Sequence, residues 1–363
     1  MNRNEEIQLK LGWMRAALLR SQARALHLKG SDWFFWATAG ADNTVLLAAE
    51  TGIAEVLVTA DQAWVLTNEI EAERLKAEQA VPGFEFYVAP WAEAETFQVF
   101  VTRQSEGGKV MCDRPVRDEL PLDSLLWKQR LVMTEAEISR YRATGLLASQ
   151  AMSEVLMQAK SHWSELALAG AAAECLWTRG LHPALILAAG SQRAARYRHP
   201  LPTAARLEAG AMLVFCARGY GLYANLTRFV SFAPPAAAIT QHQKSIMEIE
   251  AVALEATRPG RRLSEIYQVF SQQYARVGHP EAIKAHHQGG LTGYLAREAI
   301  AQPASEWILE AHNTVAWNPS LPGAKIEDTF LLGAHGELEN LTFDSAWPHT
   351  EVAGRMRPLA WQA

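Results

Sequence analysis

Six side chains in the second half of the sequence are of types that could take part in a reaction. They are His199, the adjacent His286 and His287, the adjacent Arg297 and Glu298, and Glu327. An imidazole titrates near neutral pH and can accept or donate a proton there. The planar fork of a guanidinium group matches the two oxygens of a carboxylate. The set could therefore combine proton transfer with recognition of a substrate carboxylate.

Each of these side chains also has an ordinary structural interpretation. His199 could be a loop histidine ahead of a proline, and the paired histidines could be satisfied residues at the end of a strand. Arg297 could be a surface residue paired with Glu298. Glu327 could be a carboxylate that accepts backbone donors. The residue types alone leave both interpretations open.

The elements that must position these residues are helices followed by strands. Thr134 predicts the N-cap of a long amphipathic helix that runs to about Lys160, since acidic residues fill its first turn. Further helices are expected from Ser164 and over 237–257 and 262–277, with a sharp stop at Arg258-Pro259-Gly260. Strands are expected at 185–189, 212–216, 314–317, 329–332 and 339–342.

The first part of the sequence has a different pattern. It predicts an opening helix, with apolar Leu9, Leu11 and Met14 between charges, and a polar helical stretch over 69–78. Short strand-like runs lie at 44–47, 55–59, 64–67, 84–88 and 109–113. We therefore expect a small α/β domain over 1–130 and a second domain over 131–363.

Composition excludes several classes of protein. The 363 residues are 49% hydrophobic and 20% charged, as in soluble globular proteins. The net charge of −5 and the lack of long Lys/Arg runs argue against a nucleic-acid partner. No apolar stretch reaches the roughly 18 residues of a membrane span, and the charged start lacks a signal-peptide core. The separated Cys112, Cys175 and Cys216 form no disulfide framework, which favours a cytoplasmic location.

Short motifs in the second domain follow one another in a fixed order. They are Thr134-Glu135-Ala136-Glu137-Ile138, Ala189-Gly190-Ser191, Arg198-His199-Pro200-Leu201-Pro202-Thr203, Leu207-Glu208-Ala209-Gly210, Tyr223-Ala224-Asn225-Leu226-Thr227-Arg228, Arg258-Pro259-Gly260, His286-His287-Gln288-Gly289-Gly290 with Arg297-Glu298, and Lys325-Ile326-Glu327-Asp328-Thr329. In order and spacing they resemble the creatinase/aminopeptidase P/prolidase superfamily over residues 133–345. The resemblance implies an α+β fold, with a C-terminal pita-bread domain preceded by a smaller ribonuclease-H-like α/β domain. It also implies a homodimer.

The chain departs from this superfamily at the metal site. Its peptidases hold two divalent cations with two Asp, one His and two Glu. By the resemblance, those positions fall on Val214 (or Phe215), Asn225, Gly290, Asn318 and Glu327. One carboxylate with neutral groups offers too few anionic donors for two dications. The resemblance and these departures together predict a protein without a metal or other cofactor.

Creatinase, a member that uses no metal, suggests roles for the residues that remain. By that resemblance His199 is the catalytic acid/base, and Glu327 orients the substrate or pairs with His199. Arg297 takes the place of an arginine that grips the substrate carboxylate. The other candidate substrate-binding residues are His286, His287, Asn225, Asn318, Tyr294 and Glu298. Creatinase has a Glu at the position of Asn225, so its substrate does not carry over.

Three functions stay open at this point. The first is a metal-independent hydrolase of a C–N bond in a small polar carboxylate substrate, either a small molecule or a short peptide. The second is a non-catalytic pita-bread module that binds a partner, as histone-chaperone relatives of this fold do. The third is an atypical Xaa-Pro metallopeptidase, which stoichiometric bound Mn²⁺, Co²⁺ or Zn²⁺ would indicate.

Overall fold

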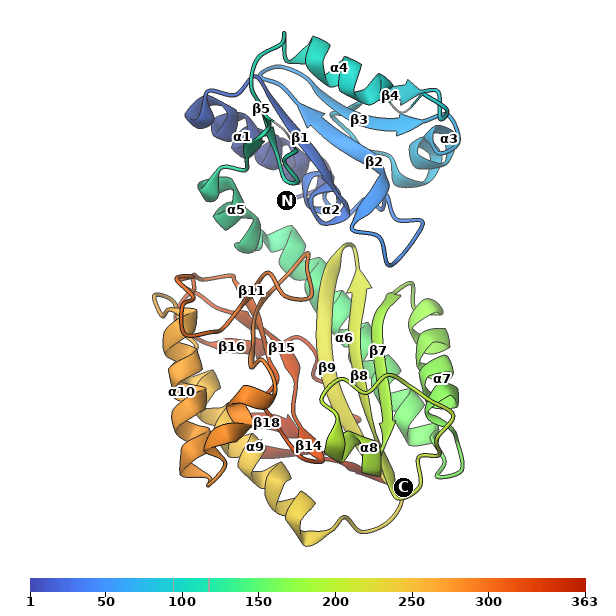
Figure 1. Ribbon diagram of the computed structural model, residues 1–363, viewed down its shortest axis with the longest axis vertical. Helices are drawn as coiled ribbons and strands as arrows, with labels where there is room; N and C mark the ends of the chain where they lie inside the picture. The colour runs from blue at the N-terminus through green and yellow to red at the C-terminus, as the bar shows by residue number, and fades with distance from the viewer. Residues whose placement is uncertain (94, 117) are drawn as a thin grey trace. The chain divides into compact units, whose positions relative to one another are not determined.

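The chain forms two compact units, Met1–Ile138 and Ser139–Ala363, which we call the N-terminal and C-terminal units. The computed structural model describes residues 1–93, 95–116 and 118–363 (Figure 1). In those ranges no helix is both long enough and apolar enough to cross a bilayer. The three cysteines are buried free thiols.

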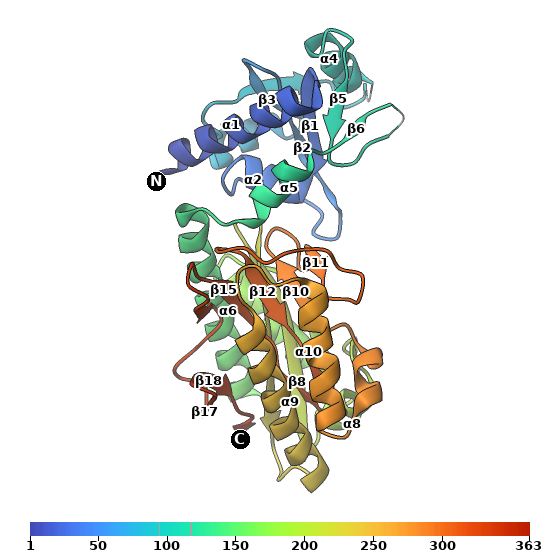
Figure 2. The ribbon, with the colours of Figure 1, turned by 90° about the vertical axis from the view of Figure 1, so that its left-hand side faces the viewer.

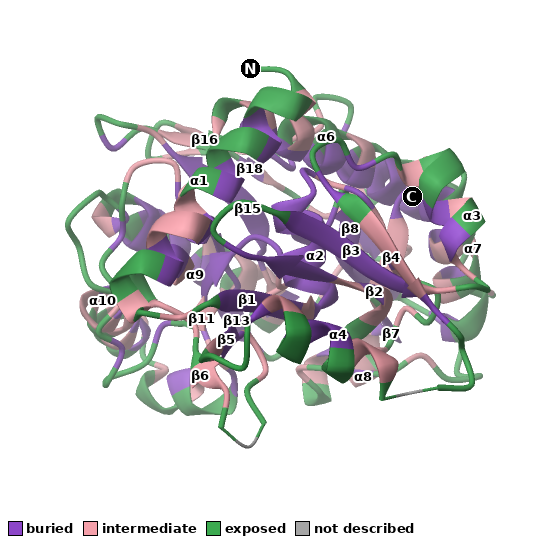
Figure 3. Ribbon diagram, turned by 90° about the horizontal axis from the view of Figure 1, so that it is seen from above, coloured by how far each residue is buried: buried purple, intermediate pink, exposed green. Residues whose placement is uncertain are grey.

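The N-terminal unit is built on a six-stranded sheet with the order β4-β3-β2-β1-β5-β6. Its strands are β1 (Ala25–Gly30), β2 (Thr51–Val58), β3 (Ala63–Asn68), β4 (Glu85–Ala89), β5 (Val110–Cys112) and β6 (Leu120–Pro121). Its helices are α1 (Arg3–Ser21), α2 (Ser31–Ala37), α3 (Ala72–Arg74), η1 (Leu75–Gln79), α4 (Thr96–Gln104) and α5 (Ser124–Leu131). Figure 3 shows β3 largely buried and β2 buried toward its end, whereas α1 and α4 turn exposed faces to solvent.

One expectation for this unit is wrong, and one strand was missed. The apolar run at 44–47 forms no strand; Val45 is 61% exposed and Leu46 is 67% exposed, so neither side chain has a core to bury in. The sheet instead contains β1, which was not expected and which pairs with both β2 and β5. The predicted N-cap before the next long helix is confirmed, because Thr134 and Glu137 exchange hydrogen bonds as a capping box.

The C-terminal unit contains two main sheets. Their orders are β19-β9-β8-β7 and β11-β10-β12-β15-β16. The first has β7 (His182–Gly190), β8 (Gly210–Gly219), β9 (Leu222–Ser231) and β19 (Trp361–Gln362). The second has β10 (Gly289–Thr292), β11 (Ala299–Ile300), β12 (Thr314–Trp317), β15 (Asp328–Leu332) and β16 (Leu338–Asn340). Two hairpins add β13 (Ser320–Leu321) with β14 (Ala324–Lys325), and β17 (His349–Val352) with β18 (Arg355–Pro358).

Helices cover these sheets. They are α6 (Glu135–Gln158), α7 (Glu165–Trp177), α8 (Ser191–Arg196), α9 (Ala237–Ala256), α10 (Leu263–Arg276) and the short 3₁₀ helix η2 (Pro280–Ala285). Apolar side chains of α6 and α7, among them Leu156 and Leu176, share one buried cluster with Leu213 and Phe215 of β8. On another side of the unit, α9 and α10 run next to each other (Figure 2).

The two main sheets meet at β9. The β8–β9 pair is antiparallel and in register along its whole length, with Val214 opposite Thr227 and Cys216 opposite Asn225. On its other edge β9 contacts the second sheet, because the Thr227 N–H donates to the Glu327 carbonyl at 3.0 Å. This junction places Glu327 between the two sheets, where chain segments about 100 residues apart come together.

Candidate active site

Glu327 lies at the centre of the candidate site and is almost fully buried. Its Oε1 accepts from Arg297 Nη2 at 2.6 Å, and its Oε2 pairs with Lys325 Nζ at 2.9 Å and accepts from Thr227 Oγ1 at 2.9 Å. Burial alone would raise the pKa of Glu327, but the charges of Lys325 and Arg297 outweigh it and lower the pKa to about 2. Glu327 is therefore a permanent anion at neutral pH.

Lys325 is the site residue that sequence reasoning missed. Its side chain is only 5% exposed, and its ammonium group points to the carboxylate two positions further along the chain. In an extended strand, residues i and i+2 lie on the same face, so the Lys-x-Glu spacing could have indicated the pair. Lys325 is buried as part of the β13–β14 hairpin, which no motif in the sequence predicted.

Three imidazoles gather beside this ion cluster. The Nε2 atoms of His199 and His286 lie 2.9 Å apart, so one ring donates to the other, and the ring of His287 stacks on His286 with centroids 4.4 Å apart. Burial, aided by the charge of Lys325, lowers the pKa of His286 to about 2. Burial and Arg297 lower the pKa of His287 to about 4, and burial lowers the pKa of His199. All three rings are neutral at neutral pH.

Acidification is expected to destabilise the C-terminal unit through His286. Its pKa of about 2 in the fold lies below the 6.5 of an unperturbed histidine, so between these values the unfolded chain binds more protons. The free energy of unfolding is therefore unaffected by His286 above pH 6.5, and it decreases as the pH falls below 6.5. At pH 5 the loss is about 2 kcal/mol. Urea unfolding at pH 7.5 and 5.0 measures it.

A matched pair of variants isolates this effect. His286→Asn should show a smaller loss of stability between pH 7.5 and 5.0 than the native chain. His335→Asn, at an exposed position, should behave like the native chain. Equal pH dependence in the native chain and in His286→Asn would contradict the assignment of the buried neutral ring.

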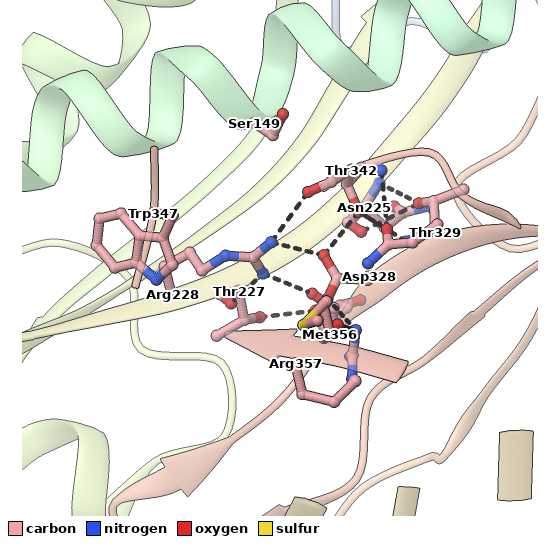
Figure 4. Close-up of polar contacts among 12 residues, drawn as sticks. Ser149, Asn225, Thr227, Arg228, Asp328, Thr329, Thr342, Trp347, Met356 and Arg357 are labelled. Carbon is pink, nitrogen blue, oxygen red and sulfur yellow. Dashed lines mark hydrogen bonds and ion pairs between the residues drawn. The ribbon is translucent and has the colours of Figure 1, made fainter. Parts of the chain in front are cut away.

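A buried ion network supports the strand that follows Glu327 (Figure 4). Asp328 is 0% exposed and accepts from Arg228 Nη2 at 2.7 Å and from Thr342 Oγ1 at 2.7 Å; it also pairs with Arg357 Nη1 at 2.9 Å. Arg357 in turn makes a bidentate pair with Glu250 of α9, at 2.7 and 2.6 Å. Arg228 also donates to the Glu327 carbonyl, so the network fixes the backbone at the site.

The comparison with protein families gives a match over residues 139–334, more than half of the chain, to the family described as metallopeptidase family M24. The chain belongs to this family. Its membership confirms the predicted superfamily, that of creatinase, aminopeptidase P and prolidase, and the predicted class of peptidase-type hydrolase. A search of curated proteins finds no match.

Solved structures share the fold along nearly the whole M24 chain. A prolidase from Pyrococcus horikoshii OT3 has a TM-score of 0.78 at 19% identity, covering 92% of this chain and 98% of its own. A Xaa-Pro dipeptidase from Bacillus anthracis has a TM-score of 0.78 at 17% identity, covering 98% and 100%. The N-terminal domain of the FACT complex subunit SPT16 from chickpea, Cicer arietinum, has a TM-score of 0.70 at 11% identity, covering 93% and 96%. These likenesses confirm the predicted α+β fold with its pita-bread domain.

The side chains at the positions that the resemblance assigns to metal ligands do not fit a pair of divalent cations. Val214 packs in an apolar cluster with Met212 and Ala189. Asn225 uses its side-chain amide to donate to Thr292 Oγ1 at 2.9 Å. Asn318 is a buried neutral amide. Hard dications need anionic oxygens, and none of these positions supplies one.

The two remaining ligand positions are blocked in other ways. A Cβ atom added to Gly290 would lie 2.0 Å from the Ala299 carbonyl oxygen, so the backbone leaves no room for a histidine there. Both oxygens of Glu327 are already engaged by cations. The three imidazoles place possible ligand atoms within 4.8 Å of one another. The charges of Lys325 and Arg297, which lower the pKa of the His287 ring, also repel a metal ion from this group.

The predicted site residues are only partly brought together. His199, His286, His287, Arg297 and Glu327 form one electrostatically coupled group. Asn225 sits beside it on β9, linked through the backbone to Thr329. Tyr294 and Asn318 are buried, and Glu298 accepts from the Leu295 N–H at 3.1 Å.

One predicted interaction is wrong and one open alternative is settled. The suggested pairing of Glu327 with His199 is not found among the described residues, because the carboxylate faces two stronger cationic partners and His199 contacts His286 instead. Arg297 is not a surface arginine, since its side chain is 14% exposed and pairs with Glu327.

Proposed function

We propose that this M24 protein is a metal-independent hydrolase that cleaves a C–N bond in a small polar carboxylate substrate. The observation that carries the proposal is the occupation of both Glu327 oxygens by Lys325 and Arg297. Two side-chain cations stand at the one carboxylate that M24 peptidases would use for metal ions. Beside them lies His199, an exposed neutral imidazole suited to proton transfer.

The residues divide the work as follows. Arg297 holds the substrate carboxylate, since its buried Nε has no partner among the described residues. Water adds to the carbon of the scissile C–N bond, and His199 accepts the proton that the water loses. His199 then gives that proton to the nitrogen as the C–N bond breaks. The products are an amine and a carbon fragment that has gained the hydroxyl group.

Metal content is the first test of this proposal. The pure protein is incubated with Mn²⁺, Co²⁺ and Zn²⁺, freed of excess ions and analysed by elemental mass spectrometry. We expect no metal near one equivalent per chain, because Lys325 and Arg297 occupy the one carboxylate and their charges repel an ion from the imidazoles. About two equivalents would contradict metal independence and favour an Xaa-Pro peptidase. One equivalent that His286→Ala removes would assign a metal to the imidazoles and would also contradict the proposal.

A substrate screen completes the test. Small guanidino, ureido and acylamino acids are offered to the native chain, and release of amine is followed. Turnover of one of these compounds without added metal would support the proposal. The proposal also includes a homodimer, which the resemblance supports. It includes a cytoplasmic location, which the three free thiols support.

A second candidate function is a binding module without turnover. The likeness to the SPT16 N-terminal domain favours it, because that protein bears the same fold as part of a complex subunit. Saturable binding of a compound from the panel, with no turnover of any of them, would favour the module over the hydrolase.

A further inference from the structure

Lys325 pairs with Glu327, but the steps proposed above give it no contact with the substrate. Its ammonium group is buried, and Glu327 is its only partner among the residues that the structure describes. A lysine ammonium carries three donors, so two of them remain for another acceptor. A buried ammonium with unused donors is costly unless a ligand or water completes it.

The charges in this cluster do not balance. Lys325 and Arg297 face the single carboxylate of Glu327, which leaves a formal net charge of +1. The other nearby carboxylates have partners of their own. Asp328 pairs with Arg228 and Arg357, and Glu250 pairs with Arg357. Glu298 accepts from the Leu295 N–H. The neighbouring imidazoles add no negative charge. An unbalanced charge away from water favours the binding of one negative group.

We propose that Lys325 is a further substrate-binding residue, which forms with Arg297 a subsite for one carboxylate group of the substrate. The inference rests on the proposed function and narrows its substrate class to monoanions. Arg297 offers a planar fork and Lys325 a compact point charge, so the two can hold a carboxylate from two directions. A carboxylate brings the cluster to neutrality. A phosphate dianion would reverse its sign, and a neutral amide would leave it charged.

Calorimetric binding tests this subsite without any need for turnover. The probes are two acids, N-acetylglycine and ureidoacetate, each paired with its neutral carboxamide, and inorganic phosphate. We expect each acid to bind the native chain at least about tenfold tighter than its carboxamide, as charge-assisted hydrogen bonds predict. We also expect the acids to bind tighter than phosphate.

Variants of Lys325 decide whether this residue binds the substrate carboxylate. Lys325→Met should reduce the acid-to-amide preference to less than about threefold, and Lys325→Arg should restore part of it. Lys284→Met is the matched control, since Lys284 is exposed and paired with Glu281, and it should keep the native preference. If Lys325→Met does not fold, as shown by circular dichroism, Lys325→Gln replaces it, because it keeps a donor and removes the charge.

The outcomes separate this inference from the proposed function. An unchanged acid-to-amide preference in a folded Lys325→Met or Lys325→Gln chain would overturn the inference, as would a native chain without that preference. The same measurement in His199→Ala, which removes the acid/base but no cation, should give the native preference. The hydrolase proposal instead stands or falls on the turnover that His199→Ala loses.

Discussion

Replacing His199 by alanine is expected to lower turnover of the substrate found in the screen by about 10² to 10⁴-fold, the usual contribution of a positioned acid/base. The reason is geometric and electrostatic. His199 is the exposed member of the imidazole group, and it is neutral at the pH where it must accept a proton. Substrate binding should change much less, because Arg297 and Glu327 remain in place. Steady-state kinetics separates the loss in kcat from any change in KM.

The control for this prediction is His335→Ala, which removes an exposed imidazole from the turn between β15 and β16. It should retain native turnover. If His199→Ala turns over the substrate as fast as the native chain does, His199 is not the acid/base. Proton transfer would then have to come from another group, and the hydrolase proposal in its present form would fail.

The second large effect is expected on stability. Asp328→Asn keeps the shape of the side chain but removes the charge that Arg228 and Arg357 share. Breaking a buried ion pair from one side leaves uncompensated charge, which costs about 3–5 kcal/mol. Chemical denaturation followed by circular dichroism should show a lower midpoint for the transition of the C-terminal unit. Substrate binding should weaken as well, because Arg228 also holds the backbone at Glu327.

An exposed ion pair provides the comparison. Glu281→Gln removes the partner of Lys284. The side chain of Glu281 is 77% exposed and that of Lys284 is 72% exposed. Such pairs contribute less than about 1 kcal/mol, so the midpoint should hardly move. If Asp328→Asn were as stable as Glu281→Gln, the network of Figure 4 would not be what holds the second sheet to β9.

The fold could be predicted from sequence largely because its elements carry local signals. The capping residue Thr134 marks the start of α6, and the stop at Arg258-Pro259-Gly260 and the ordered motifs mark the C-terminal unit, without any knowledge of tertiary contacts. The prediction of a strand at Val45 and Leu46 was wrong for the opposite reason. Its apolar pattern satisfies strand propensity, but only burial against neighbours turns such a run into a strand, and that is decided by the tertiary structure.

The sequence predicted most of the residues of the site but not the contacts between them. His199 and His286 were named as candidates, but their 2.9 Å contact joins residues 87 positions apart and has no local signature. Lys325 has no place among the expected ligands, and Arg357 reaches Asp328 from a hairpin near the end of the chain. Motifs identify the positions that a family uses, whereas the charged partners at those positions depend on which distant segments the fold brings together.

The close approach of Gly290 to the Ala299 carbonyl limits how this chain could be redesigned. Asn225, Asn318 and Val214 could each be given a carboxylate by a single replacement. A histidine at Gly290 could not follow until β10 and β11 had separated, and Lys325 and Arg297 would still stand against the incoming ions. The backbone as well as the side chains therefore stands against a two-metal site here. Building a two-metal site into this scaffold would therefore require a change in strand spacing as well as in side chains.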